Sequence, residues 1–91
     1  SPALDVIHLL SEKGAEVSYY DPHVPHIRWE ELVMDSITDW KAEVKRADCV
    51  VIITNHQVFD YAAILESAQL IVDTRNALGK SGKSNSKVVR L

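Results

Sequence analysis

The chain has 91 residues, a formal net charge of −3, 46% hydrophobic and 25% charged residues, and a single cysteine. The length predicts one small domain over residues 1–91. The acidic balance gives no support to nucleic-acid binding, and one cysteine excludes a disulfide framework. No apolar run approaches the roughly 18 residues that span a membrane, and no signal-peptide pattern opens the chain. The composition is compatible with a cytoplasmic protein.

The first part of the chain predicts a helix, a strand and an ambiguous segment. Apolar residues at helical spacing predict a helix over residues 2–13, with Ser1 as its N-cap. Residues 17–20 predict a strand that ends before a proline. For residues 23–37, periodicity leaves a short helix and an extended segment equally open.

The rest of the chain alternates between predicted helices and strands. The elements are a helix over residues 40–47, a strand over 49–53, a helix over 61–68, a strand over 70–73, a mobile loop over 80–87 and a short strand over 88–91. Such alternation predicts an α/β fold of the Rossmann-like kind, with three layers and a mainly parallel sheet. No strand precedes the opening helix. The first strand is therefore expected upstream, or its place is filled by another segment or chain.

The two most apolar runs, residues 49–53 and 70–72, each end in a polar cluster. A short, continuously apolar run is typical of a parallel strand that is buried on both faces. In an open α/β sheet, ligands bind beyond the carboxyl ends of the strands. The candidate ligand-binding residues are therefore Asn55, His56, Arg75 and Asn76.

Each candidate also has a structural interpretation. The pattern favours Thr54 as the cap of the following helix, whereas Asn55 and His56 stay open between a structural role and ligand contact. Arg75 follows a buried strand, where a guanidinium can hold a phosphate or carboxylate through two hydrogen bonds. An ion pair between Arg75 and Asp73 or a neighbour is equally compatible with the sequence.

Four further features of the sequence point to no site. The glycine-rich stretch 79–84 fails the spacing of a phosphate-binding loop, because Ala77 stands where the first glycine is required. The chain contains no GxGxxG fingerprint, so it is not expected to bind NAD. His23 and His26 lie among prolines, which excludes the helical spacing of a metal site. Cys49 opens an apolar strand and is expected to be a buried, inert thiol.

Four motifs together resemble a known family in their order and spacing. They are residues 1–6, residues 14–17 leading to 20–22, residues 47–56 with Phe59, and residues 72–76. The chain resembles the C-terminal domain of the UDP-glucose/GDP-mannose dehydrogenase family. The Asp-Thr-Arg-Asn form of the last motif is more similar to the branch that acts on UDP-N-acetylhexosamines.

The resemblance implies an NAD-dependent enzyme that oxidises the C6 hydroxyl of a nucleotide sugar to a carboxylate in two steps. It implies an N-terminal domain that binds NAD, a central helical dimerisation region and this domain, which binds the UDP-sugar. The catalytic cysteine and lysine belong to the earlier parts, so this chain is expected to carry no catalytic residue and to be inactive alone. Arg75 is similar to the arginine that reaches across the domain interface toward the bound nucleotide sugar.

Two other classes of function stay compatible with the sequence. One is a non-enzymatic interaction module that recruits another chain by strand addition at an open sheet edge. The other is a nucleotide-binding regulatory module of flavodoxin-like strand order. Binding of a UDP-sugar distinguishes the first expectation from an interaction module.

Overall fold

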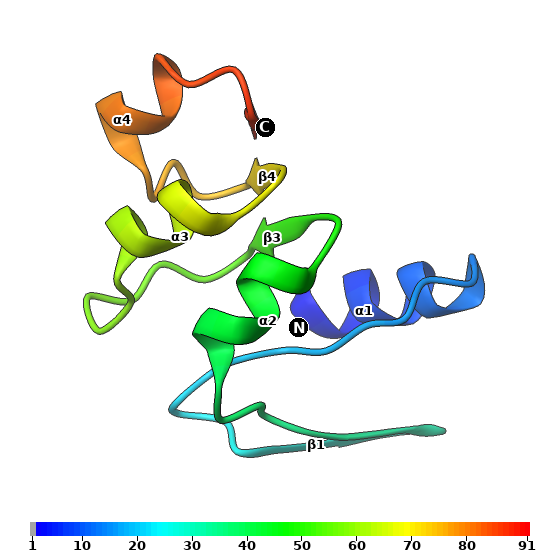
Figure 1. The fold of residues 1–91 in the computed structure, drawn as a ribbon. Coiled ribbons are helices and arrows are strands. Elements are labelled where there is room, and N and C mark those ends of the chain that lie inside the picture. The colour runs from blue at the N-terminus through cyan, green and yellow to red at the C-terminus, as the bar shows by residue number, and fades with distance from the viewer. Residues whose placement is uncertain (1) are drawn as a thin grey trace. The chain divides into compact units, whose positions relative to one another are not determined.

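The computed structural model describes residues 2–91, so the predicted N-cap, Ser1, lies outside the described residues. The chain divides into two compact units, Ser1–Trp40 and Lys41–Leu91 (Figure 1). Helix α2, Trp40–Arg46, begins at the boundary between them. No helix within residues 2–91 has the length and apolar character needed to cross a membrane.

The first unit opens with helix α1, Pro2–Glu12, which agrees with the predicted helix to within one residue. Gly14 ends it with a φ of 93°, a left-handed conformation in which only glycine is free of strain. The Ala15 N–H then donates to the Leu10 carbonyl at 3.0 Å. This contact satisfies a carbonyl in the last turn that has no partner within the helix.

The strand predicted for residues 17–20 is wrong, because these residues form no strand in the structure. A strand needs a neighbouring ladder of backbone hydrogen bonds. The Tyr19 carbonyl accepts one such bond, from the Ile37 N–H at 2.9 Å. A single bond of this kind does not make a ladder, although the sequence composition favours an extended backbone.

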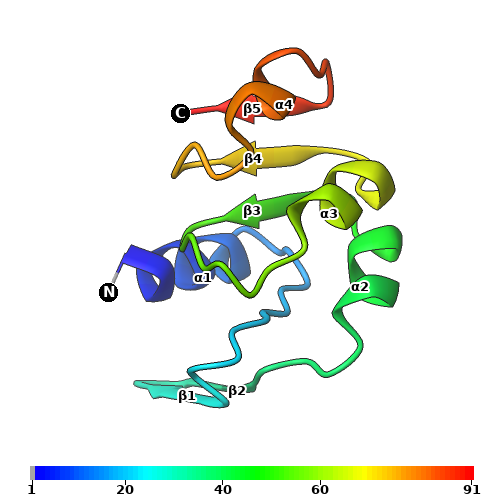
Figure 2. The same ribbon diagram turned by 90° about the vertical axis from the view of Figure 1, so that its left-hand side faces the viewer.

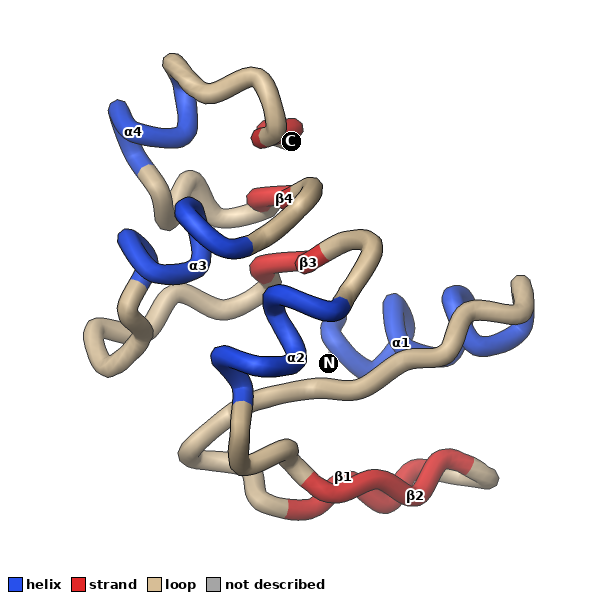
Figure 3. Tube along the Cα trace, viewed as in Figure 1, coloured by secondary structure: helices blue, strands red, loops and turns tan. Residues whose placement is uncertain are grey.

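Residues 23–37, which the sequence left open, contain an antiparallel hairpin (Figure 3). Its strands are β1, His26–Trp29, and β2, Leu32–Asp35. Side chains alternate along both strands, with one half-buried face and one exposed face. The turn places Glu30 at a φ of 55°. Half-buried and exposed side chains thus alternate along both strands, but each strand is too short for this pattern to exclude a helix from the sequence alone.

The second unit contains a parallel three-stranded sheet in the order β3–β4–β5 (Figure 2). Its elements are β3 (Val50–Ile52), α3 (Tyr61–Ser67), β4 (Ile71–Asp73), α4 (Gly79–Lys83) and β5 (Val88–Arg90). Helices α3 and α4 cover the same face of this sheet (Figures 1 and 2). The predicted α/β, Rossmann-like fold with parallel strands is confirmed.

Helix α4 occupies the first half of the segment 80–87, which the sequence predicted to be a mobile loop; residues 84–87 form turns and irregular backbone. The reason for the helix is close packing at Gly82, which is buried. A Cβ atom there would lie 2.8 Å from the Leu78 Cβ and 3.4 Å from a Val88 methyl group. The absence of a side chain thus allows a short helix to pack against the start of β5. Glycine, serine and lysine composition indicates a loop only where no such packing is available.

The core of the second unit surrounds β4. Ile71 is completely buried. The other buried apolar residues of this unit are Ile52, Ile64, Ala68 and Leu78. Burying a Leu or Ile side chain stabilises the fold by about 1.5–3 kcal/mol, so β4 and its neighbours carry much of the apolar stabilisation.

The sequence predicted that β3 is buried on both faces and that Cys49 is inaccessible. This prediction is wrong. Cys49 is exposed and precedes the strand, and Val50 and Val51 are half-buried. Partial desolvation nevertheless raises the pKa of the Cys49 thiol. A thiol with a raised pKa forms less of the nucleophilic thiolate, so the expectation of low reactivity does not depend on burial.

Candidate functional site

The polar clusters after β3 and β4 emerge at one edge of the sheet. The two strands are parallel, and Ile52 is the register partner of Asp73. Thr74 joins the strand ends: its N–H and its hydroxyl donate to the Ile52 carbonyl at 3.1 and 2.7 Å. Residues 53–56 and 74–76 therefore begin side by side at the carboxyl edge, where ligands of open α/β sheets bind.

Asp73 fixes the loop that follows β4. Its side chain is 1% exposed. One carboxylate oxygen accepts from the N–H groups of Arg75 and Ala77, at 3.1 and 3.0 Å, and the other accepts from Leu78 at 3.0 Å. Burial raises the pKa of this carboxyl group, but the backbone hydrogen bonds outweigh it, so the pKa lies below its usual value.

The arrangement around Asp73 does not contain the ion pair with Arg75 that the sequence left open. Asp73 contacts Arg75 through the backbone N–H. Among the residues that the structure describes, the guanidinium of Arg75 has no carboxylate within ion-pair distance. Arg75 is exposed at the carboxyl edge. The geometry therefore presents a cation on a fixed loop.

Asn76 has a positive φ of 55° and is held by Arg90. The Nη2 atom of Arg90 donates to the carboxamide oxygen of Asn76 at 3.1 Å. Arg90 ends β5 and is the register partner of Asp73, so it reaches the same edge from the neighbouring strand. Sequence reasoning missed Arg90. The signal was available, because a cation at the end of a third parallel strand must lie at this edge.

Asn55 and His56 are joined through Tyr61. The Tyr61 hydroxyl donates to the carboxamide oxygen of Asn55 at 2.9 Å and accepts from the His56 N–H at 3.0 Å. Phe59 packs edge-to-face on both rings, with centroids 5.3 Å from His56 and 5.8 Å from Tyr61. Sequence reasoning placed Tyr61 only in a helix stripe and missed its second role.

The cap of α3 is Asp60, not Thr54. The Asp60 carboxylate accepts from the Ala63 N–H at 3.0 Å. The helix begins at Tyr61, seven residues after Thr54, so Thr54 lies too far away to cap it. Thr54 is exposed in the loop after β3.

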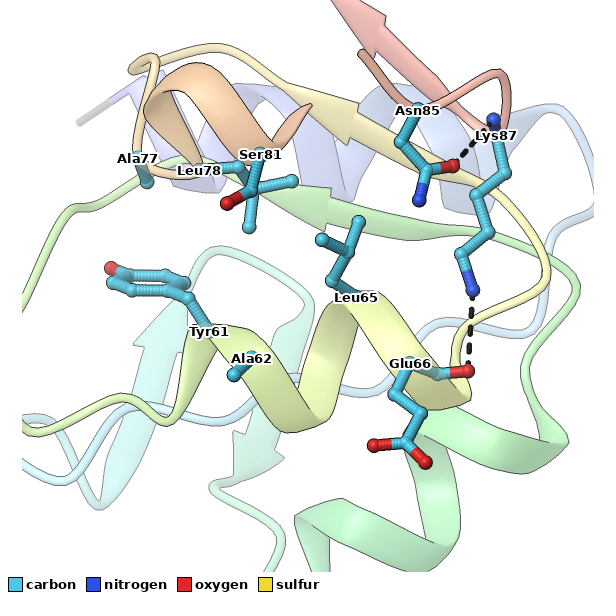
Figure 4. A pocket seen from close by; sticks show the side chains of 9 residues that line it. All are labelled: Tyr61, Ala62, Leu65, Glu66, Ala77, Leu78, Ser81, Asn85 and Lys87. Atoms are coloured by element: carbon cyan, nitrogen blue, oxygen red, sulfur yellow. Dashed lines mark hydrogen bonds between the residues drawn. The ribbon is translucent and has the colours of Figure 1, made fainter. Parts of the chain in front are cut away.

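A pocket of about 420 Å³ lies between α3 and α4. Figure 4 shows its walls, with Tyr61 and Leu65 on one side and Leu78 and Ser81 on the other. Lys87 closes one end, where its ammonium group donates to the Glu66 carbonyl at 3.2 Å. Tyr61 thus belongs both to this pocket and to the hydrogen-bonded cluster with Asn55.

The described residues show neither a glycine-rich turn of the NAD-binding kind nor a group of metal ligands. The connection from β3 to α3, residues 53–60, contains no glycine, so its backbone cannot approach a pyrophosphate as a GxGxxG turn does. Within residues 2–91, no three His, Cys, Asp or Glu side chains are grouped to hold a metal. His26 instead contacts the Asp35 carboxylate at 2.6 Å.

Comparison with known proteins identifies a family for most of this chain. Residues 1–80 match the model of the UDP-glucose/GDP-mannose dehydrogenase family, UDP binding domain. A UDP-N-acetyl-D-mannosamine dehydrogenase from Methanococcus maripaludis is 32% identical over 89 residues, which cover 89% of this chain and 19% of that protein. One of the same name from Methanococcus vannielii is 34% identical over 86 residues, covering 86% of this chain and 19% of its own length.

The chain thus spans about a fifth of the length of these curated relatives. No solved structure matches it. The family match includes both strand ends of the candidate site and stops within α4. By this match, the chain belongs to the UDP-glucose/GDP-mannose dehydrogenase family, as its UDP binding domain.

Proposed function

We propose that this chain is the UDP-sugar-binding C-terminal domain of an NAD-dependent UDP-sugar 6-dehydrogenase. The observation that carries the proposal is the exposed guanidinium of Arg75 on a loop that buried Asp73 fixes at the carboxyl edge of the sheet. NAD would be bound by an N-terminal domain outside this chain, since residues 53–60 do not fit it. The other partners would be a central domain and further copies of the enzyme, in the cytoplasm.

The proposed substrate class is a UDP-N-acetylhexosamine. Both the Methanococcus relatives described above carry the name UDP-N-acetyl-D-mannosamine dehydrogenase. The Asp73–Asn76 motif of this chain supports the same branch. The overall reaction would convert the C6 hydroxyl of the sugar to a carboxylate, with two equivalents of NAD as the oxidant and water as the source of the second oxygen.

In this proposal the residues at the sheet edge bind the ligand and do not take part in the oxidation. The Arg75 guanidinium would pair with diphosphate oxygens through charge-assisted hydrogen bonds. Asn55 and His56 would add hydrogen bonds from the end of β3, where Tyr61 fixes them. A ligand bound here would therefore be held by groups from two neighbouring strand ends.

Calorimetric titration of the chain with UDP tests the proposal. We expect saturable binding of UDP and at least about tenfold weaker binding of uridine, since uridine lacks the diphosphate that would pair with Arg75. Inorganic phosphate serves as the second control and should compete poorly. Equal affinity for UDP and uridine, or no binding of UDP, would favour an interaction module instead.

The chain alone is expected to form no NADH from UDP-N-acetyl-D-mannosamine and NAD. It has no glycine fingerprint for the dinucleotide, and its single thiol, Cys49, has a raised pKa. NADH formation is measured by its absorbance. The control is the same purification carried out on an expression host that lacks the plasmid. NADH formation that follows the purified chain rather than the control would contradict this expectation.

A further inference from the structure

Arg90 occupies a position at the candidate site that the family match does not reach. The match covers residues 1–80, whereas Arg90 ends β5. Its register partner is Asp73, so the two residues stand side by side at the carboxyl edge. The Leu91 N–H also donates to the Asp73 carbonyl at 3.2 Å, which extends the pairing one residue beyond Arg90. The end of β5 is therefore fixed against the strand that carries the ligand-binding loop.

The contact between Arg90 and Asn76 falls at the most constrained residue of that loop. Asn76 has a φ of 55°, a left-handed conformation that non-glycine residues seldom adopt. Among non-glycine residues, asparagine adopts it more often, because its short carboxamide can form hydrogen bonds that compensate. Here the carboxamide oxygen accepts from the Arg90 guanidinium at 3.1 Å. Arg75 directly precedes this turn, so the backbone at Asn76 governs where Arg75 stands.

We propose that Arg90 is a positioning residue for UDP binding: its guanidinium holds the left-handed turn at Asn76 and thereby keeps Arg75 in place for the diphosphate. The proposal rests on the proposed function, because it assumes that UDP binds at this edge. Asp73 fixes the loop from within through backbone N–H groups. Arg90 would fix it from the outer strand through a side chain.

A double-mutant cycle on UDP affinity tests this role. Asn76→Gly removes the carboxamide but keeps the left-handed conformation accessible, so the chain should still fold. Arg90→Met removes the donor. Each single variant should weaken UDP binding about fivefold, which is the loss expected for one hydrogen bond. The double variant should bind UDP no more weakly than the single variant with the lower affinity. Arg90→Lys should recover most of the affinity, since an ammonium group can still donate to Asn76.

The matched control is Arg28→Met, which removes an exposed arginine from β1 in the other unit. It should leave UDP affinity within about twofold and so corrects for the change in net charge. The inference would be overturned if Arg90→Met bound UDP with unchanged affinity while Arg75→Ala bound it more weakly. The proposed function would then still stand. Losses that multiply in the double variant would also overturn the inference, because Arg90 would then contact UDP independently of Asn76. Absence of UDP binding by the unaltered chain would overturn both.

Discussion

Replacement of Asp73 by alanine is expected to lower the free energy of unfolding by about 3–5 kcal/mol, because buried backbone donors lose a charged acceptor. The N–H groups of Arg75, Ala77 and Leu78 all depend on this carboxylate. Leu78 is itself buried, so water cannot replace the lost acceptor there without disturbing the core. A domain of this size has only about 5–15 kcal/mol of stability, so the variant should be largely destabilised.

Asp73→Asn separates the loss of the negative charge from the loss of the whole hydrogen-bonding side chain. An asparagine keeps one acceptor oxygen but turns an N–H₂ group toward one of the backbone donors, so the expected loss is about 1–3 kcal/mol. Urea unfolding followed by circular dichroism measures both variants. Asp48→Asn is the matched control, since it removes an exposed carboxylate in the same unit. Equal stability of the Asp73 and Asp48 variants would show that the buried hydrogen bonds contribute nothing.

The lowered pKa of Asp73 also gives the direction of the pH dependence. Its folded pKa lies below the unfolded value of about 3.9, so its contribution to stability is complete above that value. The contribution is lost as the pH falls below about 4 and through the lowered folded pKa, because the group must then be protonated. The Asp73→Asn variant should therefore lose less stability than the unaltered chain over this acidic range.

The position of the candidate site followed from the sequence because it depends on strand order alone. Two apolar runs separated by a helix pattern predict parallel strands, and parallel strands end at one edge. Arg75 and Asn55 lie at that edge in the structure because of this rule. Side-chain roles within the edge did not follow. The sequence left an ion pair between Arg75 and Asp73 open beside ligand binding, but Asp73 is buried and its partners are backbone N–H groups.

The incorrect predictions share a physical cause, which is packing and pairing between elements that local composition does not encode. Residues 17–20 have the composition of a strand but no ladder among the described residues. Gly82 belongs to a helix only because a residue without a side chain can pack against Leu78 and Val88. Cys49 is exposed and precedes β3, which is an edge strand of the three-stranded sheet. Local composition carries no information on which strand stands at an edge.

Arg75→Ala is expected to weaken UDP binding by about ten- to a hundredfold, because a hydrogen bond to a charged group contributes about 1.5–3 kcal/mol. The fold should be unaffected, since the guanidinium of this exposed residue has no ion-pair partner among residues 2–91. The Arg75 backbone N–H, which does support the fold through Asp73, is retained in the alanine variant. Calorimetric titration with UDP and the melting temperature together measure the two roles.

Arg75→Lys shows what the guanidinium adds to its charge. A lysine ammonium is a point charge that cannot form the two parallel hydrogen bonds of an arginine with a phosphate, so it should recover only a minor part of the lost affinity. Arg28→Lys, at an exposed strand position, is the matched control and should bind UDP as the unaltered chain does. A lowered melting temperature with unchanged UDP affinity in Arg75→Ala would mean that Arg75 is structural. Full recovery of UDP affinity in Arg75→Lys would mean that Arg75 contributes through its charge alone, and recognition through two parallel hydrogen bonds would no longer be part of the proposal.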